Sequence, residues 1–548
     1  MRALLALLVL ALCPLSAAMT RPALAQAPAV AGAAAPDTVS GRLERILQRG
    51  RLIVGVKDDY PPWGVRNADG DLVGLEIDLA ADLAARLGVT LELIAVSAAN
   101  RLPRLEQGVV DVVIATLGDT EERRQISDLI QPHYYASGVT LLARPDLPYR
   151  DWGQLRGRPV CLTGGAYFNR ALQERYLVEG QVFPSNGAAL LALADGRCVG
   201  WAFDDTAIAQ LALSGAYPGL EPALPVILPT PWAIAVARGE GDAAWGRFVA
   251  DVVVDWHVSG FLLDRQAAWG LQRTRFLEDM QGVWSRRDAD GAPVCARGAD
   301  GAFPAGCLID DVARIGAGPV VVPDWAVRLE GATGLELGVL FDAFARAKLA
   351  QGIGVTLALS GVAVVGALAV GVMLGLADRA AAALWLVRAP IRAVVTVARM
   401  TPPILQLYIV FFGLGSVLAN SYAITPGAFL VAGLIFSFYA GATNAVLISA
   451  ALEVERRRHP DASLVALVPA AMVRAFDGLV ASCVNIVKAA GMASAIALTE
   501  VIATVNTLIA EGASAATLMN FLLVFYFLFV MAVIWLFRGA RHLVGVRQ

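Results

Sequence analysis

The chain has 548 residues, and at roughly 150 residues per domain this length excludes a single hydrophobic core and predicts several structural units. No charged side chain occurs between Thr401 and Leu452. Because a helix needs about 20 apolar residues to cross a bilayer, this run excludes a wholly soluble protein. The formal net charge of −3 indicates little, since we expect it to average an acidic outer domain with basic inner loops.

The N-terminus has the pattern of a secretory signal peptide. Arg2 precedes the apolar stretch 3–12, and Ala23-Leu24-Ala25 is a small-residue cleavage pattern. We expect a signal peptide over residues 1–25 and an Ala- and Pro-rich tether over residues 26–44. An uncleaved anchor helix is the alternative, but the short apolar core favours cleavage.

The region 45–275 alternates strand and helix patterns. Residues 52–56 are a β-branched run typical of a buried strand, and residues 78–88 repeat apolar side chains at helical spacing. After a break at 145–149, a second α/β stretch follows over 158–212. Before this break, further strands are expected at 91–96 and 109–115, and further helices at 101–107 and 121–129. This order predicts βαβ units around mostly parallel sheets, in two α/β lobes with a cleft between them.

Four segments carry a resemblance to a known family. The region resembles the solute-binding proteins of polar amino-acid ABC importers in VGVKDDYPPWGVRNADGDLVGLEIDLAADLAARLG, GVVDVVIATLGDTEERRQISDLIQPHYYASG, VCLTGGAYFNRAL and GRCVGWAFDD. The resemblance covers about residues 45–272. It implies the type II periplasmic-binding-protein fold, whose two lobes close over an amino acid by a hinge motion.

The resemblance implies two charged ligand contacts. Arg123 stands at the carboxylate-binding arginine, and its planar guanidinium suits a carboxylate. A solvated helix residue paired with Glu121 or Asp119 is the alternative for Arg123. Asp204 stands at the acceptor for the ammonium group, although the adjacent Asp205 could be the true partner.

Other candidates line the same implied cleft. Thr116 and Gly118 stand at hydrogen-bonding positions, and Tyr60 and Trp63 stand at the aromatic wall, although Trp63 could equally be ordinary packing. Two further lining candidates follow Gly165, namely Ala166 and Tyr167. Lys57 stands where several members of the family have an acidic residue, which argues against a cationic amino acid.

The chain has six cysteines and four histidines. Cys13 lies in the signal peptide and Cys483 in a membrane span. In an exported domain the remaining four could form two local disulfides, and the favoured pairs are Cys161 with Cys198 and Cys295 with Cys307. Zinc ligation is the rival interpretation, but no CxxC pair occurs. We interpret residues 276–336 as an extracytoplasmic insert and linker, flexible near 288–301.

The charge distribution predicts an all-α membrane domain over 337–548 with five transmembrane helices. The expected spans are 352–377, two within 401–452, one starting near Gly478 and one over 512–537. Arginines follow the first, third and fifth spans, and short cytoplasmic loops are enriched in Lys and Arg. This pattern predicts an outer N-terminus and a cytoplasmic C-terminus.

Two charges fall inside the expected fourth span. Lys488 and Glu500 are costly in an apolar run unless they are paired or face water. On a continuous helix they would lie about 18 Å apart along the axis, so they could not pair. We expect a role in the translocation path or in subunit packing. Snorkelling of Lys488 at the cytoplasmic interface is the alternative.

The membrane region resembles the permeases of histidine/glutamine-type importers in RMTPPILQLYIVFFGLG and VNIVKAAGMASAIALTEVI. The loop LEVERRRHPDASLVALVPAAMVRAF keeps Pro469 and Arg474 of the family's ATPase-docking loop but lacks its Glu-Ala-Ala-Gly arrangement. No GxxxxGK[ST] phosphate loop occurs, so we expect ATP hydrolysis on a separate chain.

Together these patterns predict amino-acid uptake by a binding domain fused to a permease in the inner (cytoplasmic) membrane, with the binding domain in the periplasm. The expected partners are a small amino acid, a separate ABC ATPase subunit, a second permease copy or homologue, and the lipid bilayer. We expect no enzymatic activity, cofactor, metal or nucleic acid. A ligand-gated channel or a solute-sensing receptor is the alternative.

Overall fold

The computed structural model describes residues 41–310, 312, 314, 316 and 320–543. The expected signal peptide and residues 26–40 of the expected tether lie outside the described residues. The first described element is helix α2, Gly41–Arg49, whose Ile46 is buried. Residues 41–44 therefore belong to a helix and not to a tether.

The first lobe is a parallel sheet with helices. Its elements are β1 (Arg51–Val56), α3 (Leu75–Leu87), β5 (Thr90–Ala95), α4 (Arg101–Glu106) and β6 (Val112–Val113). β1 lies between β5 and β6 and pairs with both in parallel. Helix α3 buries Leu79 and Leu83 and ends at Gly88, whose φ of 67° is the left-handed conformation that glycine adopts most easily. A small antiparallel sheet precedes α3 and consists of β2 (Asp59–Tyr60), β3 (Gly64–Arg66) and β4 (Leu72–Val73).

The second lobe repeats this architecture. Its elements are the turn η2 (Trp152–Leu155), β8 (Pro159–Thr163), α5 (Asn169–Arg175), β9 (Glu179–Phe183), α6 (Asn186–Ala194), β10 (Trp201–Asp204) and α7 (Asp205–Ser214). β8 pairs in parallel with both β9 and β10. The predicted βαβ units are therefore present in both lobes.

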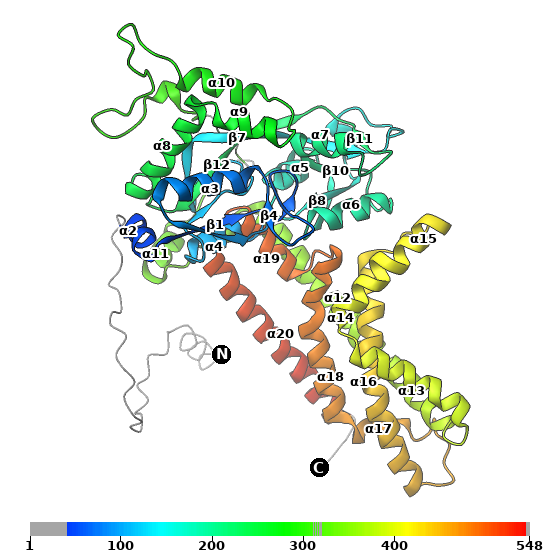
Figure 1. The fold of residues 1–548 in the computed structure, drawn as a ribbon. Helices are drawn as coiled ribbons and strands as arrows, with labels where there is room; N and C mark the ends of the chain where they lie inside the picture. The colour runs from blue at the N-terminus through cyan, green and yellow to red at the C-terminus, as the bar shows by residue number, and fades with distance from the viewer. Residues whose placement is uncertain (1–40, 311, 313, 315, 317–319, 544–548) are drawn as a thin grey trace. The chain divides into compact units, whose positions relative to one another are not determined.

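Two long strands connect the lobes. β7 (Ser127–Ala143) pairs antiparallel with β12 (Ile227–Ala237), and at its far end with β10 and the short β11 (Glu221–Pro222). β12 in turn pairs with β6 of the first lobe. The strand order is β5-β1-β6-β12-β7-β10-β8-β9, so one mixed sheet runs through both lobes (Figure 1). Because β7 and β12 are antiparallel to their neighbours, the sheet is less parallel than predicted.

The segment 121–129 differs from the prediction. Only the single turn η1, Arg123–Gln125, is helical there, and β7 begins at Ser127. The expected helix over 121–129 is therefore wrong. Pairing of Ser127, Asp128 and Leu129 with β12 replaces it.

The soluble region continues beyond residue 275. Helices α8 (Ala244–Val258), α9 (Phe261–Ala268) and α10 (Arg275–Trp284) lie together at one end of the binding domain (Figure 1). After α10 come the turn η3 (Ala305–Cys307) and helix α11 (Asp324–Thr333). The insert packs on the domain, since the amide and carbonyl groups of Ile309 both bond to the Gln131 side chain, at 2.8 and 3.2 Å.

Both predicted disulfide pairs are confirmed. The Cα atoms of Cys161 and Cys198 are 5.6 Å apart, and those of Cys295 and Cys307 are 5.9 Å apart. Cys483 is a free buried thiol. Within the described ranges, no group of three His, Cys, Asp or Glu side chains is placed to hold a metal ion, so zinc ligation by these cysteines is not supported.

In the described part of the C-terminal region, the regular elements are all helices. It begins with the turn η4 (Gly338–Leu340) and contains α12 (Ala343–Ala380), α13 (Trp385–Met400), α14 (Pro403–Tyr408), the π-helical turn η5 (Ile409–Leu414), α15 (Gly415–Tyr422), α16 (Ala428–Arg458), α17 (Val468–Arg474), α18 (Phe476–Ala489), η6 (Ala490–Ile496), α19 (Val501–Ala510) and α20 (Ala515–Leu543). In the part of the chain that the structure describes, five helices are long and apolar enough to cross a membrane, as predicted: 343–380, 403–422, 428–458, 476–496 and 515–539.

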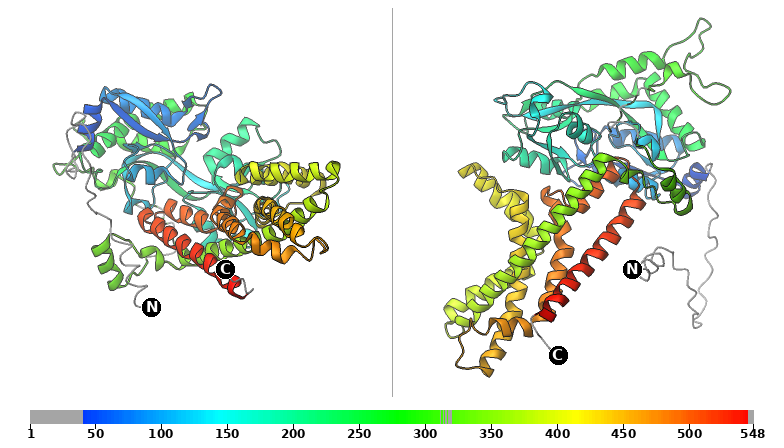
Figure 2. Two further views of the ribbon diagram at one scale, coloured as in Figure 1. Left: turned by 90° about the horizontal axis from the view of Figure 1, so that it is seen from below. Right: turned by 180° about the vertical axis from the view of Figure 1, so that it is seen from behind.

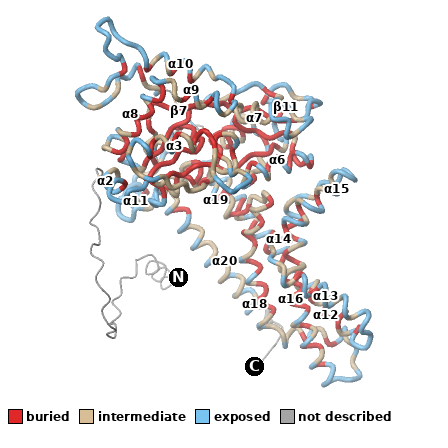
Figure 3. The backbone as a smooth tube through the Cα atoms, viewed as in Figure 1, coloured by how far each residue is buried: buried red, intermediate tan, exposed pale blue. Residues whose placement is uncertain are grey.

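Small residues bring α12 and α16 together, and the two helices run side by side (Figure 2). A Cβ atom on Gly371 would lie 2.5 Å from Cβ of Asn444, and one on Gly441 would lie 2.6 Å from Val370. Close approach of backbones at small residues is a common way for transmembrane helices to associate. The interior of the binding domain and much of α16 are buried, whereas α20 is mostly not (Figure 3).

The fourth span ends before Glu500. The helical run ends after η6 at Ala497, whose φ is 60°, and Glu500 lies beyond this residue. The Glu500 carboxylate caps α19 by accepting hydrogen bonds from the amides of Ile502 (2.8 Å) and Ala503 (2.7 Å). The prediction that Glu500 shares a continuous span with Lys488 is therefore wrong. Lys488 itself is exposed on α18.

Candidate functional site

Arg123 connects the two lobes across the cleft. Its side chain is buried within η1, immediately before β7. Nη1 donates to the carbonyl oxygen of Gly118 in the first lobe at 2.9 Å, and Nη2 donates to the carbonyl oxygen of Gly165 in the second lobe at 3.0 Å. Nε is buried without a hydrogen-bond partner. The guanidinium therefore lies between the lobes, and its Nε has no hydrogen-bond partner.

The alternative of a solvated, ion-paired Arg123 does not hold. Arg124 makes that contact instead, since its Nε and Nη2 donate to the Asp119 carboxylate at 2.8 and 2.7 Å. Glu121 pairs with Arg314. Both carboxylates that could have paired with Arg123 thus have other partners.

Asp204 lies opposite Arg123 at the end of β10. Its Oδ2 accepts a hydrogen bond from the Tyr60 hydroxyl at 2.5 Å, while its Oδ1 is buried without a partner. Asp205 is directed elsewhere, because it accepts hydrogen bonds from the hydroxyl of Ser137 (2.6 Å) and the amide of Gly138 (2.8 Å) on β7. The geometry thus favours Asp204 over Asp205 as a cleft residue.

Burial shifts the pKa values of both charged groups. It lowers the pKa of Arg123 to about 9, and the nearby charge of Arg101 adds to this effect. Burial also raises the pKa of Asp204 to about 7, although the hydrogen bond from Tyr60 opposes the rise. A buried charge is stabilised by an opposite charge at close range. A ligand carboxylate beside Arg123 and a ligand ammonium beside Asp204 would supply such partners.

Thr116 and Gly118 lie on the loop that follows β6. Thr116 has a φ of 48°, and its amide donates to Oε1 of Glu76 (2.5 Å) and to the Tyr134 hydroxyl (3.1 Å). This leaves only its hydroxyl for the expected donation to a ligand. A Cβ on Gly118 would lie 3.2 Å from the Tyr167 ring, so this position suits glycine.

The two aromatic candidates, Tyr60 and Trp63, have different surroundings. Tyr60 contacts the second lobe, since its ring centroid lies 5.1 Å from that of Phe203. Trp63 is fully buried in the first lobe and packs edge-on against Tyr135 (5.8 Å) and Trp232 (5.7 Å). The packing interpretation therefore holds for Trp63.

The segment after Gly165 forms the second-lobe side of the cleft. Ala166 and Tyr167 are both buried, and the Tyr167 hydroxyl donates to the carbonyl oxygen of Leu228 at 2.8 Å. Gly165 has a φ of 84°, and a Cβ there would lie 2.5 Å from the backbone of Ala98 in the first lobe. The two lobes are thus in close contact here.

Two further charged residues of the cleft were not predicted. Arg101 in α4 is buried and donates through Nη1 to the carbonyl oxygens of Ala115 and, at 3.0 Å, of Thr116. Glu76, in the first turn of α3, is fully buried. A signal for Arg101 was available, because it precedes Leu105 by four residues and so shares the buried face of the expected helix 101–107.

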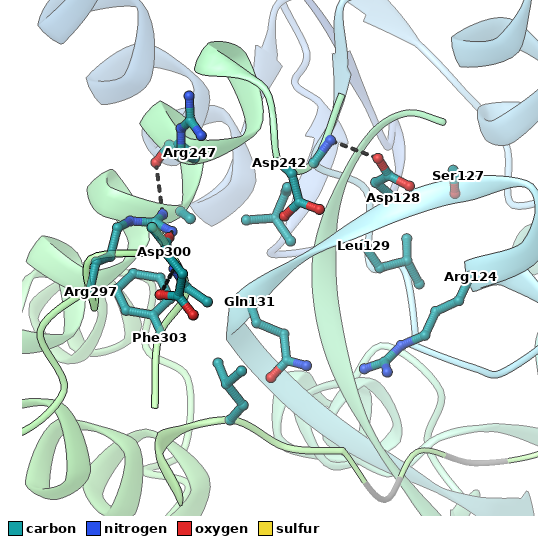
Figure 4. A pocket seen from close by; sticks show the side chains of 16 residues that line it. Arg124, Ser127, Asp128, Leu129, Gln131, Asp242, Arg247, Arg297, Asp300 and Phe303 are labelled. Atoms are coloured by element: carbon teal, nitrogen blue, oxygen red, sulfur yellow. Dashed lines mark hydrogen bonds between the residues drawn. The ribbon is translucent and has the colours of Figure 1, made fainter. Parts of the chain in front are cut away.

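A separate pocket lies outside the cleft, between β7 and the insert (Figure 4). Its volume is about 620 Å³, and Arg124, Gln131, Arg247, Arg297 and Phe303 are among the residues that line it. Arg297 is already bound by Asp251 at 2.8 Å and by the carbonyl oxygen of Gly301 at 2.7 Å. None of the predicted ligand contacts lines this pocket.

Two α/β lobes joined by two crossing strands, with opposite charges in the cleft, define a type II periplasmic-binding-protein fold. The chain belongs to the bacterial extracellular solute-binding proteins, family 3, whose model matches residues 52–396. The resemblance of residues 45–272 to amino-acid solute-binding proteins is thereby confirmed.

Curated relatives are amino-acid-binding proteins. The chain is 35% identical over 138 residues to the glutamine-binding protein of Geobacillus stearothermophilus, covering 24% of this chain and 52% of the relative. It is 34% identical over 136 residues to the L-cystine-binding protein TcyJ of Escherichia coli (strain K12), covering 24% and 51%. The matched region thus spans about half the length of these relatives.

Solved structures include an arginine-binding protein. The P235GK mutant of ArgBP from T. maritima has 25% sequence identity and a TM-score of 0.39, and the match covers 42% of this chain and 98% of that one. An amino acid ABC transporter substrate-binding protein from Streptococcus pneumoniae bound to L-arginine has 25% identity and a TM-score of 0.39, covering 42% and 99%.

Proposed function

We propose that the binding domain captures a small amino acid and delivers it to the permease domain of the same chain for uptake across the cytoplasmic membrane. One observation carries this proposal: the buried side chains of Arg123, before β7, and Asp204, at the end of β10, each keep an atom without a hydrogen-bond partner. A zwitterion carries the two complementary charges. The amino-acid-binding relatives support the same ligand class.

The helical region supports the transport half of the proposal. Five candidate spans follow the binding domain, and the arginine-rich loops after the first, third and fifth spans favour a cytoplasmic C-terminus and a periplasmic binding domain. Lys488, exposed on α18, remains our candidate for the translocation path. Its truncation without loss of uptake would remove it from that path.

A separate ATPase and a second permease would complete the transporter. Helix α17 lies between the third and fourth spans and contains Pro469 and Arg474 of the expected docking loop. Arg474 donates to Glu455 at the end of α16 at 2.6 Å, which fixes α17 to that span. We propose α17 as the contact for the ATPase. The weakly buried α20 would face lipid or a second copy.

Binding is tested by calorimetric titration of the purified full chain in detergent with the common amino acids and small carboxylates. We expect saturable binding of an amino acid and none of the matching carboxylate that lacks the amino group. Binding only to compounds without an amino group would overturn the role of Asp204. No binding to any amino acid would overturn the proposed function.

Transport is tested with membrane vesicles that contain the chain and its ATPase, using radiolabelled ligand. ATP-dependent accumulation is expected, and a C-terminal tag should be reachable only from the cytoplasmic side. Ligand binding without accumulation would favour the solute-sensing receptor. Ligand-dependent ion current would favour the channel.

A further inference from the structure

A buried carboxylate and a buried imidazole meet beside the turn that carries Arg123. Asp119, in the loop between β6 and η1, and His133, on β7, are both fully buried. Nε2 of His133 lies 2.7 Å from Oδ2 of Asp119, and because a carboxylate accepts hydrogen bonds, Nε2 is the donor. Burying a carboxylate is costly unless it is hydrogen-bonded, and here the bond comes from another strand of the sheet.

Arg124 completes the surroundings of this carboxylate. Its Nε and Nη2 donate to Asp119 at 2.8 and 2.7 Å, and its side chain is partly exposed. Burial alone would raise the pKa of Asp119, but the hydrogen bonds from His133 and Arg124 outweigh burial and lower it. The carboxylate is therefore ionised near neutral pH. Arg124 supplies the opposite charge from the solvent side, whereas His133 holds the carboxylate from the interior.

His133 lies in an irregular part of β7. Strand β12 pairs with β7 on both sides of a register shift, which leaves residues 131–134 of β7 opposite Ala233 alone. Bulges of this kind redirect side chains and are frequent beside functional sites. The carbonyl oxygen of His133 bonds to Nε2 of the buried His257 of α8 at 2.8 Å, which holds the bulge from the other side.

The Asp119–His133 pair holds the backbone that orients Arg123. The amide of Asp119 donates to the carbonyl oxygen of Pro231 on β12 at 2.8 Å. The preceding residue, Gly118, forms a β-bridge with Trp232, and its carbonyl oxygen accepts the hydrogen bond from Nη1 of Arg123 at 2.9 Å. Asp119 is thus fixed through both its side chain and its amide, and the carbonyl group of Gly118 is fixed with it.

We propose that Asp119 and His133 are positioning residues for ligand binding, whose hydrogen bond fixes the orientation of the Arg123 guanidinium. The proposal rests on the proposed function, in which Arg123 binds the α-carboxylate of an amino acid. A guanidinium binds a carboxylate through a planar fork, so its orientation decides the strength of the contact. Loss of the pair should weaken recognition of the carboxylate and leave recognition of the ammonium group unchanged.

A purely structural role for the pair predicts a different result. If the pair only stabilised the fold, its loss would lower the unfolding temperature. Affinity for all ligands would then stay the same or fall by one common factor. The preference for a ligand with a carboxylate over one without it separates the two roles.

The test is calorimetry on the purified full chain in detergent, with the common L-amino acids and their α-amides as probes. The α-amides keep the ammonium group and the side chain but lack the carboxylate. The unaltered chain should prefer the acid about 10-fold or more, as expected for hydrogen bonds to a charged group. In His133→Phe this preference should fall about 3- to 10-fold. His133→Gln, whose amide nitrogen can donate to Asp119, should restore part of it.

Two carboxylates of the same loop give a matched comparison. Asp119→Asn and Glu121→Gln each replace a carboxylate with its amide, but Glu121 is exposed and pairs with Arg314. The preference for the acid should fall about 3- to 10-fold in Asp119→Asn and stay unchanged in Glu121→Gln. Equal losses in the two variants would show that only the net charge near Arg123 matters, and would overturn the inference.

A double-mutant cycle tests whether the pair acts through Arg123. His133→Phe should change the preference little when residue 123 is already lysine, because residues of one network do not contribute independently. Thermal unfolding checks that each variant is folded. Additive losses in the cycle, or an unchanged preference in folded His133→Phe, would overturn the inference.

Failure of this inference differs from failure of the proposed function. Binding of an amino acid with a preference for the acid that depends on neither Asp119 nor His133 would overturn the inference and leave the proposed function intact. Absence of binding to any amino acid would overturn both. A preference that falls in His133→Phe and Asp119→Asn, and not in Glu121→Gln, supports both.

Discussion

Arg123 and Arg124 are adjacent arginines with different surroundings. Arg123 is buried between the lobes, whereas Arg124 forms an ion pair with Asp119. We expect Arg123→Lys to lower ligand affinity about 10- to 100-fold, because lysine cannot reproduce the planar fork. The measurement is calorimetry on the full chain.

Arg124→Lys is the matched control for that change. It retains the charge beside Asp119 and lies outside the cleft, so affinity should stay within about 3-fold. Equal losses in the two variants would contradict the assignment of the carboxylate to Arg123.

The raised pKa of Asp204 predicts pH-dependent binding. The ammonium group of a ligand binds the ionised carboxylate, and burial raises the pKa of Asp204 to about 7. Affinity should therefore rise as the pH increases toward 7 and then level off. Below that value it should fall by up to about 10-fold per pH unit, because the proton must first be lost. Calorimetry across pH 5 to 8.5 measures this profile.

Glu76 has a similarly raised pKa and could produce the same profile. The variant Glu76→Gln separates the two groups, because it removes only one of them. The slope should persist in this variant. An affinity independent of pH in the unaltered chain would show that Asp204 is already ionised in acid.

The sequence predicted part of the candidate site. The motif predicted Arg123, and Asp205 was an alternative to Asp204 because the two residues are adjacent. Only the structure distinguishes them, because Asp204 accepts a hydrogen bond from Tyr60 whereas Asp205 accepts one from Ser137. Arg101 was missed because one arginine in a short helix usually lies in solvent.

Among the elements, the polar run before β7 misled the prediction. The residues DTEERR favour a helix locally, and a helix was predicted over 121–129. In the structure only Arg123–Gln125 form a helical turn. The following strand pairs with β12, whose sequence lies about a hundred residues away, so no local pattern could reveal it. The long-range pairing therefore overrides the local preference.

The membrane spans were easier to predict, because charge and length alone decide whether a segment can cross a bilayer. The end of the helical run at Ala497 could not be predicted from charge and length. It occurs in an apolar run without proline, and a positive φ at alanine leaves no mark in the sequence. Glu500 was for this reason placed in the wrong helix.

Close packing of α12 on α16 gives a prediction for the membrane domain. In Gly371→Ala the added methyl would lie 2.5 Å from Cβ of Asn444. We expect a loss of about 1–3 kcal/mol in the free energy of unfolding, as for other overpacked positions. Thermal unfolding of the full chain in detergent measures the change.

Gly361→Ala is the matched control on the same helix. A Cβ on Gly361 meets no atom within 4 Å. The unfolding temperature of this variant should match that of the unaltered chain. An equal loss in both variants would indicate a general effect of substituting glycine in α12.

At the scale of the whole molecule, the second lobe contacts the second span. Nη2 of Arg197 donates to the carbonyl oxygen of Phe411 at 2.7 Å, and Nη1 to that of Pro426 at 3.0 Å. The guanidinium also lies 3.8 Å from the centroid of the Phe411 ring. Phe411 belongs to the π-helical turn η5, a type of irregularity that is frequent at functional sites.

This contact predicts a separation of capture from delivery. Arg197→Ala should lower the uptake rate about 5-fold or more, since a buried cation–π contact contributes on the order of 1–2 kcal/mol. Ligand affinity of the full chain should not change, because Arg197 is remote from the cleft contacts described above. Vesicle uptake and calorimetry measure the two quantities.

Arg273→Ala is the control for this change, because Arg273 is highly exposed and pairs only loosely with Glu278, at 3.6 Å. Uptake by this variant should be normal. Normal uptake by Arg197→Ala as well would show that the contact with Phe411 is not used in delivery.

The position of Gly165 suggests a variant that would change how the two lobes of the binding domain close. Its backbone lies against Ala98 of the opposite lobe, with no room for even a methyl group. The methyl group of an alanine at this position would keep the two lobes from closing fully, while the fold of each lobe would be unchanged. Under the proposed function, such a variant would show whether the helical region responds to closure of the lobes or to the bound ligand.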